Sequence, residues 1–160
     1  MTRRVPPQDA GLLDVHVDMA SSRDLASIAQ IDADALGSAR RRALLKRAIK
    51  AGSCFVARTP DDVVGFAILD RSFFGEAYLS LLIVARDYRR MGVGRALVRH
   101  VESRIPGRKL FTSTNRSNRP MQRFCAALGF VRSGVVENLD EGDPELIYVK
   151  WARGPRDRGR

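Results

Sequence analysis

Residues 78–104 read YLSLLIVARDYRRMGVGRALVRHVESR, and this stretch decides the fold class of the chain. It opens with an apolar run at 79–85 that is too short to span a membrane and that contains the β-branched residues Ile83 and Val84. Such a run predicts a buried strand. Apolar residues then recur at helical spacing through 96–105, with charged residues between them, which predicts an amphipathic helix. The stretch therefore predicts a strand, a short turn and a helix.

The turn that joins the predicted strand to the predicted helix has the composition of an anion-binding site. It contains Gly92 and Gly94, one residue apart, and these follow Arg89 and Arg90. The first turn of a helix leaves backbone N–H groups unpaired and carries the positive end of the helix dipole. Glycines let phosphates approach that backbone closely, and arginines add charge-assisted hydrogen bonds. No Gly-Lys-Ser/Thr follows, as a nucleoside-triphosphate loop requires, and the third glycine of the dinucleotide fingerprint is missing.

The segment 89–94, RRMGVG, resembles the acyl-CoA loop of the GNAT superfamily of N-acetyltransferases. The pattern of that loop is Arg/Gln-x-x-Gly-x-Gly/Ala. The strand that precedes it also has the family's spacing, since Val84 lies eight residues ahead of Gly92.

A second segment downstream resembles the same family. Asn115, Asn118 and the sequence FCAALGF at 124–130 are similar to the family's N-x-x-N…(F/L)-Y-x-x-L-G-F pattern. The resemblance covers about 15–151. It implies the GNAT fold, an α/β architecture with a central, mixed and mostly antiparallel sheet of about seven strands flanked by about four helices.

The resemblance implies acetyl-CoA as a co-substrate and no metal. The pantetheine arm would pair with the backbone of the central strand, and the pyrophosphate would lie on the N–H groups of the turn. The amide N–H of Val84 would stabilise the oxyanion formed when an amine attacks the acetyl group directly, and Asn118 would close over the thioester end. The residues that the resemblance assigns to the cofactor are Leu82, Ile83, Val84, Arg89, Arg90, Met91, Gly92, Val93, Gly94, Arg95, Asn115 and Asn118.

The candidate proton carriers depart from the family's pattern. The family's proton donor to the departing thiolate is a tyrosine, and that position is Cys125 here, whose thiol is either an acid or a structural side chain. Relatives place a glutamate base at the position of Tyr78 or at that of Ser113, and neither is a carboxylate here. Glu76 points to the same side as Tyr78 by strand alternation, so it either acts through a water or lies at the surface.

The composition predicts one cytosolic, cytoplasmic domain of bacterial type. The 160 residues suffice for a single core, and we expect a disordered leader at 1–12, one GNAT domain at 13–151 and a basic, disordered tail at 152–160. No stretch approaches the roughly 20 apolar residues of a membrane helix, and the N-terminus lacks the apolar region of a signal peptide. The two cysteines, Cys54 and Cys125, indicate neither a disulfide framework nor a zinc site.

The charge pattern leaves the acceptor open. The formal net charge is +10, with basic residues concentrated in a predicted amphipathic helix at 38–52 and acidic residues in a loop at 140–145. Each segment is either an ordinary solvated surface or a contact for a charged acceptor or partner. We expect no nucleic acid, because no stacking aromatics or groove-reading motif accompany the arginines. The predicted strand 146–151 is a candidate interface for a homodimer.

The function that these features favour is acetyl-CoA-dependent transfer of an acetyl group to a primary amine. The amine would belong to a small molecule, an amino acid-like compound or a protein. Because the family's tyrosine is replaced and no base is assigned, a second function stays open: a catalytically silent GNAT-fold module that binds acyl-CoA as a regulatory ligand.

Overall fold

The computed structural model describes residues 11–152. The predicted disordered leader and basic tail therefore lie outside the described residues, apart from Gly11, Leu12 and Ala152. In chain order the elements are β1 (His16–Met19), η1 (Ser22–Asp24), α1 (Leu25–Leu36), α2 (Arg42–Lys50), β2 (Cys54–Arg58), β3 (Val63–Phe73), β4 (Glu76–Val84), η2 (Arg86–Tyr88), α3 (Val93–Ser103), β5 (Lys109–Asn115), α4 (Arg119–Ala127), β6 (Val131–Val136) and β7 (Glu145–Trp151).

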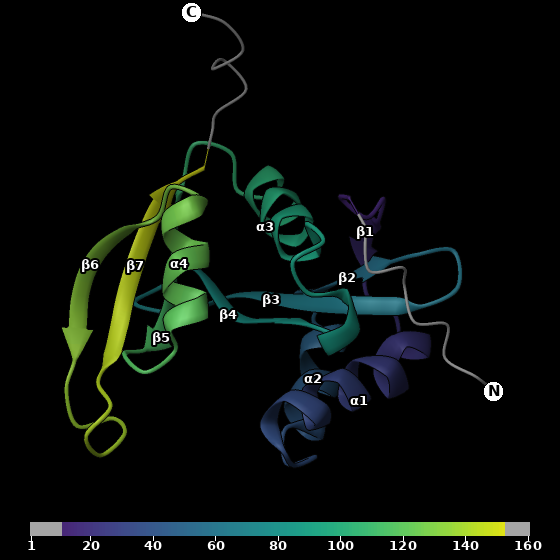
Figure 1. Cartoon of the computed structure of the whole chain (residues 1–160), viewed down its shortest axis with the longest axis horizontal. Helices are drawn as coiled ribbons and strands as arrows, with labels where there is room; N and C mark the ends of the chain where they lie inside the picture. Colours follow the sequence, from purple (N-terminus) through teal and green to yellow (C-terminus); the bar gives the residue numbers. More distant parts are fainter. Residues whose placement is uncertain (1–10, 153–160) are drawn as a thin grey trace, which may run out of the picture. The chain divides into compact units, whose positions relative to one another are not determined.

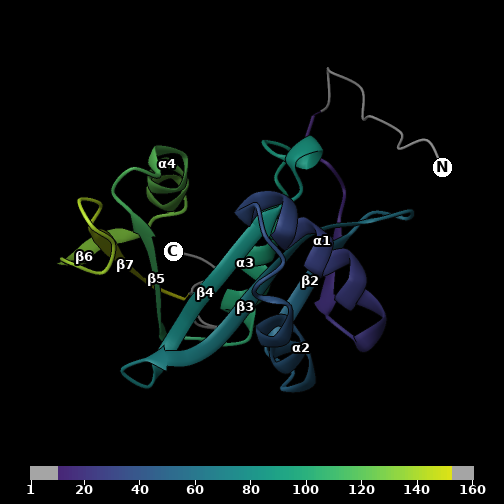
Figure 2. The same ribbon diagram turned by 90° about the horizontal axis from the view of Figure 1, so that it is seen from below.

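The strands form one seven-stranded sheet in the order β1-β2-β3-β4-β5-β7-β6 (Figure 1). The pairs β1–β2, β2–β3, β5–β7 and β6–β7 are antiparallel, and β4 pairs in parallel with β5. Figure 2 shows β3 and β4 side by side up to the hairpin that joins them. The predicted mixed, mostly antiparallel sheet of about seven strands with four α-helices is confirmed for residues 11–152.

The described chain divides into two compact units. The first comprises residues 11–68 and 81–101, and the second comprises residues 69–80 and 102–152. The first unit therefore contains α1, α2, most of α3 and the end of β4, whereas the second contains the β3–β4 hairpin, α4 and β5 to β7. The assignment of 13–151 to a single domain stays a prediction.

In the first unit, α1 and α2 pack against one face of β2 and β3. The apolar residues of each helix recur at helical spacing and so form one face. Ile28 of α1 and Leu45 of α2 are completely buried in one cluster with Val56 and Phe66. Val56 and Phe66 are direct neighbours in the β2–β3 ladder, so both point to the same face of the sheet.

The opposite face of the same strands carries α3. Phe55, next to Val56 on β2, lies with its ring centroid 5.0 Å from that of His100 on α3. On β3, the position of a Cβ atom at Gly65 would lie 3.2 Å from Val93 and 3.3 Å from Leu97. The end of β4 thus lies in a layer with helices on both faces, which explains why 81–85 is continuously apolar.

Two buried aspartates in the first unit are neutralised by arginines. The Asp32 carboxylate on α1 accepts hydrogen bonds from Nε and Nη2 of Arg41, which precedes α2. The Asp24 carboxylate in η1 accepts from Nη1 and Nη2 of Arg58 on β2, at 2.7 and 2.9 Å. Buried carboxylates are stable when they are paired in this way, so each pair ties a helical segment to its neighbour.

The second unit is built around β5, which pairs with Ala77, Tyr78 and Leu79 of β4 on one side and with β7 on the other. Leu110 of β5 and Leu146 of β7 are fully buried. Glu102 and Lys150 form an ion pair with a 2.6 Å separation between the carboxylate and the ammonium group.

Candidate active site

The turn before α3 has the backbone conformation that its glycine predicts. Gly92 has φ +85° and Arg90 has φ +63°, so two left-handed residues flank Met91. The carbonyl oxygen of Gly92 accepts the first helical hydrogen bond, from the Ala96 N–H at 3.0 Å. The N–H groups of Val93 and the two residues that follow therefore belong to the first turn of α3, where helices leave donors unpaired.

A contact that the sequence did not indicate lies on this turn. The N–H of Leu13 donates to the Met91 carbonyl at 2.9 Å. A Cβ atom at Gly92 would lie 2.9 Å from a side-chain carbon of Leu12. A glycine is thus required at position 92 for two reasons: its backbone is left-handed, and a side chain there would collide with Leu12.

The end of β4 is held by hydrogen bonds on two sides. The Ala85 N–H donates to the Val64 carbonyl of β3 at 2.8 Å. Arg89 folds back so that its Nε donates to the Val84 carbonyl at 3.1 Å. Since Val84 C=O and Ala85 N–H belong to one trans peptide, the Val84 carbonyl points away from β3.

The Val84 N–H points away from β3 as well. The Ile83 carbonyl oxygen lies against Gly65 of β3, only 3.0 Å from the position that a Cβ atom would take there. The N–H of Val84 shares a trans peptide with that carbonyl and therefore has the opposite direction. Both polar backbone groups of Val84 thus face the side on which Arg89 lies.

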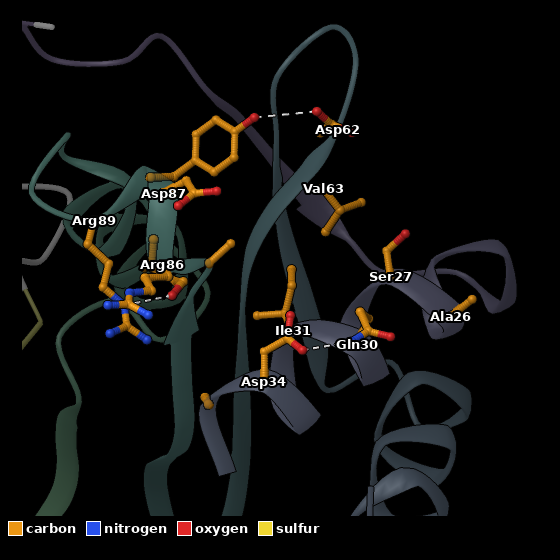
Figure 3. Close-up of a pocket in the computed structure, with 14 residues that line it drawn as sticks. Ala26, Ser27, Gln30, Ile31, Asp34, Asp62, Val63, Arg86, Asp87 and Arg89 are labelled. Carbon is orange, nitrogen blue, oxygen red and sulfur yellow. Dashed lines mark hydrogen bonds between the residues drawn. The ribbon is translucent and has the colours of Figure 1, made fainter. Parts of the chain in front are cut away.

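A groove of about 910 Å³ in the first unit reaches this strand end (Figure 3). It lies between α1, the start of β3 and residues 84–89. Figure 3 shows Gln30 and Asp34 of α1 across the groove from Arg86 and Arg89. Asp34 accepts a hydrogen bond from Gln30 at 2.7 Å. The groove therefore presents both carboxylates and guanidinium groups beside Val84.

The predicted cofactor residues fall into two groups. Residues 82–95 lie in the first unit, as the end of β4, η2, the turn and the start of α3, and Val84 and Arg89 line the same groove. Asn115 and Asn118 lie in the second unit and are engaged there. Asn115 donates to Asp140 at 2.8 Å, and Asn118 caps α4 by accepting from the Met121 N–H at 3.2 Å.

The acidic loop at 140–145 is tied to the turn between β5 and α4. Asp143 accepts from the backbone N–H and the hydroxyl of Ser117, and these bonds hold the pKa of Asp143 below its usual value. The Arg116 N–H donates to the Pro144 carbonyl at 2.9 Å. Asp140 and Asp143 thus have partners within their own unit, so their charge alone is weak support for a cationic acceptor.

The candidate proton carriers all lie in the second unit. Tyr78 and Ser113 are brought together, with their hydroxyl oxygens 2.7 Å apart, and the Tyr78 ring stacks on Phe73 at 5.5 Å between centroids. Glu76 is exposed at the first residue of β4. Cys125 is 1% exposed on α4, and burial raises the pKa of its thiol to about 11.

The wall of the groove formed by α1 and by η2 was not predicted from the sequence. Gln30 and Asp34 lie one helical turn apart, and that spacing was the only local signal. Tyr88 of η2 donates to Asp62 across the groove at 3.4 Å, a contact that spans 26 residues and left no pattern in the sequence.

Residues 11–152 contain no group of three or more His, Cys, Asp or Glu side chains placed to hold a metal ion. In the same part of the chain, every helix is too short or too polar to cross a membrane.

The comparison with known proteins agrees with this geometry. The model of the Acetyltransferase (GNAT) family matches residues 23–130. A search of curated proteins found no match. Among solved structures, a GNAT-family acetyltransferase from Bacillus cereus ATCC 10987 is 42% identical, with a TM-score of 0.82 over 87% of this chain and 98% of that chain.

Two more distant structures share the fold. Ard1 from Thermoplasma volcanium is 23% identical, with a TM-score of 0.77 over 88% of this chain and 99% of that chain. A protein from Bacillus anthracis str. Ames, solved in complex with acetyl coenzyme A, is 21% identical, with a TM-score of 0.54 over 61% of each chain. The family model and the Bacillus cereus structure together cover most of the described residues, and the chain therefore belongs to the GNAT family and is an N-acetyltransferase.

Proposed function

We propose that the chain transfers the acetyl group of acetyl-CoA to a primary amine by direct attack. The observation that carries this proposal is the direction of the Val84 N–H, away from β3, at a groove that ends in the turn before α3. The family match and the relative solved with acetyl coenzyme A support the choice of donor. The acceptor is an amine of a small molecule, an amino acid-like compound or a protein.

The cofactor would bind along residues 82–95. Its pyrophosphate would accept hydrogen bonds from the N–H groups of Val93, Gly94 and Arg95, because a helix N-terminus attracts anions. The guanidinium of Arg90 would add positive charge. The pantetheine arm would pair with the backbone of 82–84, as a peptide pairs with a free strand edge.

The reaction needs a neutral amine, a stabilised oxyanion and a proton for the thiolate. The amine nitrogen attacks the thioester carbon, and the carbonyl oxygen becomes an oxyanion that accepts a hydrogen bond from the Val84 N–H. Collapse of the tetrahedral intermediate breaks the C–S bond and expels the thiolate. The amine proton passes to a base, and a second proton reaches the thiolate.

The proton carriers are proposed as follows. Cys125 is the candidate acid, because its thiol stands at the position of the family's tyrosine. Burial raises the pKa of this thiol to about 11, which makes it a weaker proton donor than an ordinary thiol. Water is the alternative donor. Glu76, acting through a water molecule, is the candidate base, and Tyr78 is the second candidate. The hydroxyl of Tyr78 is already hydrogen-bonded to Ser113, which favours a role in shaping the acceptor site.

The competing function is a silent acyl-CoA sensor. The family's tyrosine is replaced by a buried thiol, and the two positions at which relatives carry a glutamate base hold Tyr78 and Ser113, which bond to each other. A protein of this kind would bind acetyl-CoA and leave every amine unmodified.

Loss of the thioester absorbance of acetyl-CoA tests the proposal directly. The panel contains amino acids, polyamines, aminoglycosides and short peptides, and the variants are Cys125→Ala and Cys125→Ser. We expect turnover of one amine class by the wild type. If the thiol is the acid, kcat falls about 100-fold or more in Cys125→Ala and less in Cys125→Ser.

A thermal melt with and without acetyl-CoA separates the remaining outcomes. A raised Tm without turnover of any amine supports the sensor. An unchanged Tm together with no turnover would refute both functions. Melts of the two Cys125 variants without ligand show whether a lower rate reflects a loss of folding.

A further inference from the structure

We propose that Arg89 is a positioning residue for acyl transfer: through the Val84 carbonyl, it holds the strand end so that the Val84 N–H meets the thioester carbonyl of the donor. This inference rests on the proposed function above. It assigns to Arg89 a role other than direct contact with the pyrophosphate.

The first step of the argument is the peptide between Val84 and Ala85. Its carbonyl accepts from Arg89 Nε at 3.1 Å (dashed line at Arg89 in Figure 3). Its N–H donates to the Val64 carbonyl at 2.8 Å. A planar group that is bonded at both ends cannot rotate about the strand axis. Without Arg89, only the bond to β3 would hold it.

The second step is the preceding peptide, which carries the Val84 N–H. Its carbonyl oxygen, that of Ile83, faces β3 and lies 3.0 Å from the position that a Cβ atom would take at Gly65, so the Val84 N–H points to the other side. The Val84 Cα joins this peptide to the peptide that Arg89 holds. The planes of the two peptides together set the direction of the Val84 N–H, and Arg89 fixes the second of them.

The third step is the path of the chain between the two residues. After Ala85 the backbone makes the η2 turn, in which the Tyr88 N–H donates to the Ala85 carbonyl at 2.9 Å. This turn returns Arg89 to the strand end, and the next residue, Arg90, takes the left-handed conformation that opens the phosphate-binding turn. Arg89 is therefore the residue that joins the strand end to that turn.

The fourth step is the choice of arginine. A bond from a charged donor is stronger than one from a neutral donor, and the planar guanidinium fixes its direction. Arg89 forms no ion pair with a carboxylate of residues 11–152. Its hydrogen bond to Val84 is therefore the contact that orients its side chain.

Isotope-edited infrared spectroscopy of bound [1-¹³C]acetyl-CoA tests the inference without knowledge of the acceptor. A hydrogen bond to the thioester carbonyl lowers its stretching frequency. We expect a lowered frequency in the wild type and a return toward the frequency of free acetyl-CoA in Arg89→Met. Arg89→Lys, which keeps a charged donor, should lie between the two.

Arg90→Met is the matched control, because it removes an adjacent cation whose proposed partner is the phosphate. It should weaken acetyl-CoA binding and leave the carbonyl frequency of the bound donor at the wild-type value. With S-acetylpantetheine, which lacks the pyrophosphate, kcat for the best amine should fall about tenfold in Arg89→Met. It should stay near the wild-type value in Arg99→Met, which removes an exposed arginine of α3 outside the proposed site.

The outcomes separate the two proposals. If the wild type does not bind acetyl-CoA, the proposed function fails. If the wild type binds it but Arg89→Met keeps the wild-type frequency, the role of Arg89 is refuted and the proposed function stands. If the bound carbonyl is not shifted in the wild type, the role of Arg89 and the proposed contact of the Val84 N–H with the thioester are both refuted, and amine turnover alone decides the proposed function. A melt of each variant confirms that it is folded, and Arg89→Lys replaces Arg89→Met if the latter is not.

Discussion

At the scale of single residues, Gly65 shows how closely the strand end and α3 approach. A Cβ atom there would lie 3.0 Å from the Ile83 carbonyl oxygen, 3.2 Å from Val93 and 3.3 Å from Leu97. Val93 and Leu97 are both buried, so neither can move away freely. The missing side chain of Gly65 is thus what allows α3 to begin directly over the end of β4.

We predict that Gly65→Ala lowers the free energy of unfolding by about 1–3 kcal/mol, because the added methyl group overpacks a rigid contact. Urea denaturation followed by circular dichroism measures the change. Gly134→Ala in β6 is the control: apart from Gly134 and its two chain neighbours, no described residue has a heavy atom within 4 Å of its Cβ position. Its effect on the free energy of unfolding should therefore stay within about 0.5 kcal/mol. Equal urea midpoints for wild type and Gly65→Ala would contradict the prediction.

At the scale of elements, the pair of Asp24 and Arg58 ties η1 to β2. The Asp24 side chain is 6% exposed, and Arg58 also reaches Asp18 at 3.1 Å. The hydrogen bond from Arg58 is the main cause that holds the pKa of Asp24 below its usual value, and bonds from Ser21 add to it. The pair fixes the start of α1, the helix that forms one wall of the groove.

This lowered pKa makes stability depend on pH. The folded carboxylate holds its charge to lower pH than the unfolded one, so the pair stabilises the fold above the unfolded pKa of about 3.9. That contribution is lost as the pH falls through the folded pKa. We predict that Asp24→Asn is about 1–3 kcal/mol less stable than the wild type at pH 7, and that the difference narrows toward pH 2.

Urea titrations between pH 2 and pH 7 measure this narrowing. Asp14→Asn changes an exposed aspartate and is the control. Its free energy of unfolding should equal that of the wild type at each pH. The difference in free energy of unfolding between the wild type and Asp24→Asn would be the same at every pH if the charge of Asp24 played no part. Such a result would show that the introduced amide accounts for the lower stability.

At the scale of the whole molecule, the charge favours a polyanionic ligand. The chain has 28 Lys and Arg against 18 Asp and Glu, a formal net charge of +10. Such a field attracts the phosphates of coenzyme A, and salt screens it. We predict that the Kd for acetyl-CoA, measured by calorimetry, rises roughly tenfold between 0.05 and 0.5 M NaCl.

S-acetylpantetheine provides the comparison, because it carries the thioester without the phosphates. Its Kd should change by less than about twofold over the same range of salt. If both donors respond equally, the salt acts on the fold or on the acyl end, and the proposed phosphate site at 89–95 is not the cause.

What the sequence determined by itself is the strand, turn and helix of 78–104 and the family that this motif indicates. These features are local: strand and helix have distinct apolar periods, and a left-handed turn at a helix N-terminus needs a glycine such as Gly92. The mixed sheet followed from the resemblance that the motif supports.

Only the tertiary structure decided which polar groups meet. The bond between Tyr78 and Ser113 joins residues 35 positions apart, and the groove brings α1 to residues 84–89. The tie of Asn115 to Asp140 and the direction of the Val84 N–H are likewise set by the packing of separate segments. Such contacts leave no period in the chain, because each depends on backbone directions that are set only when distant elements pack together.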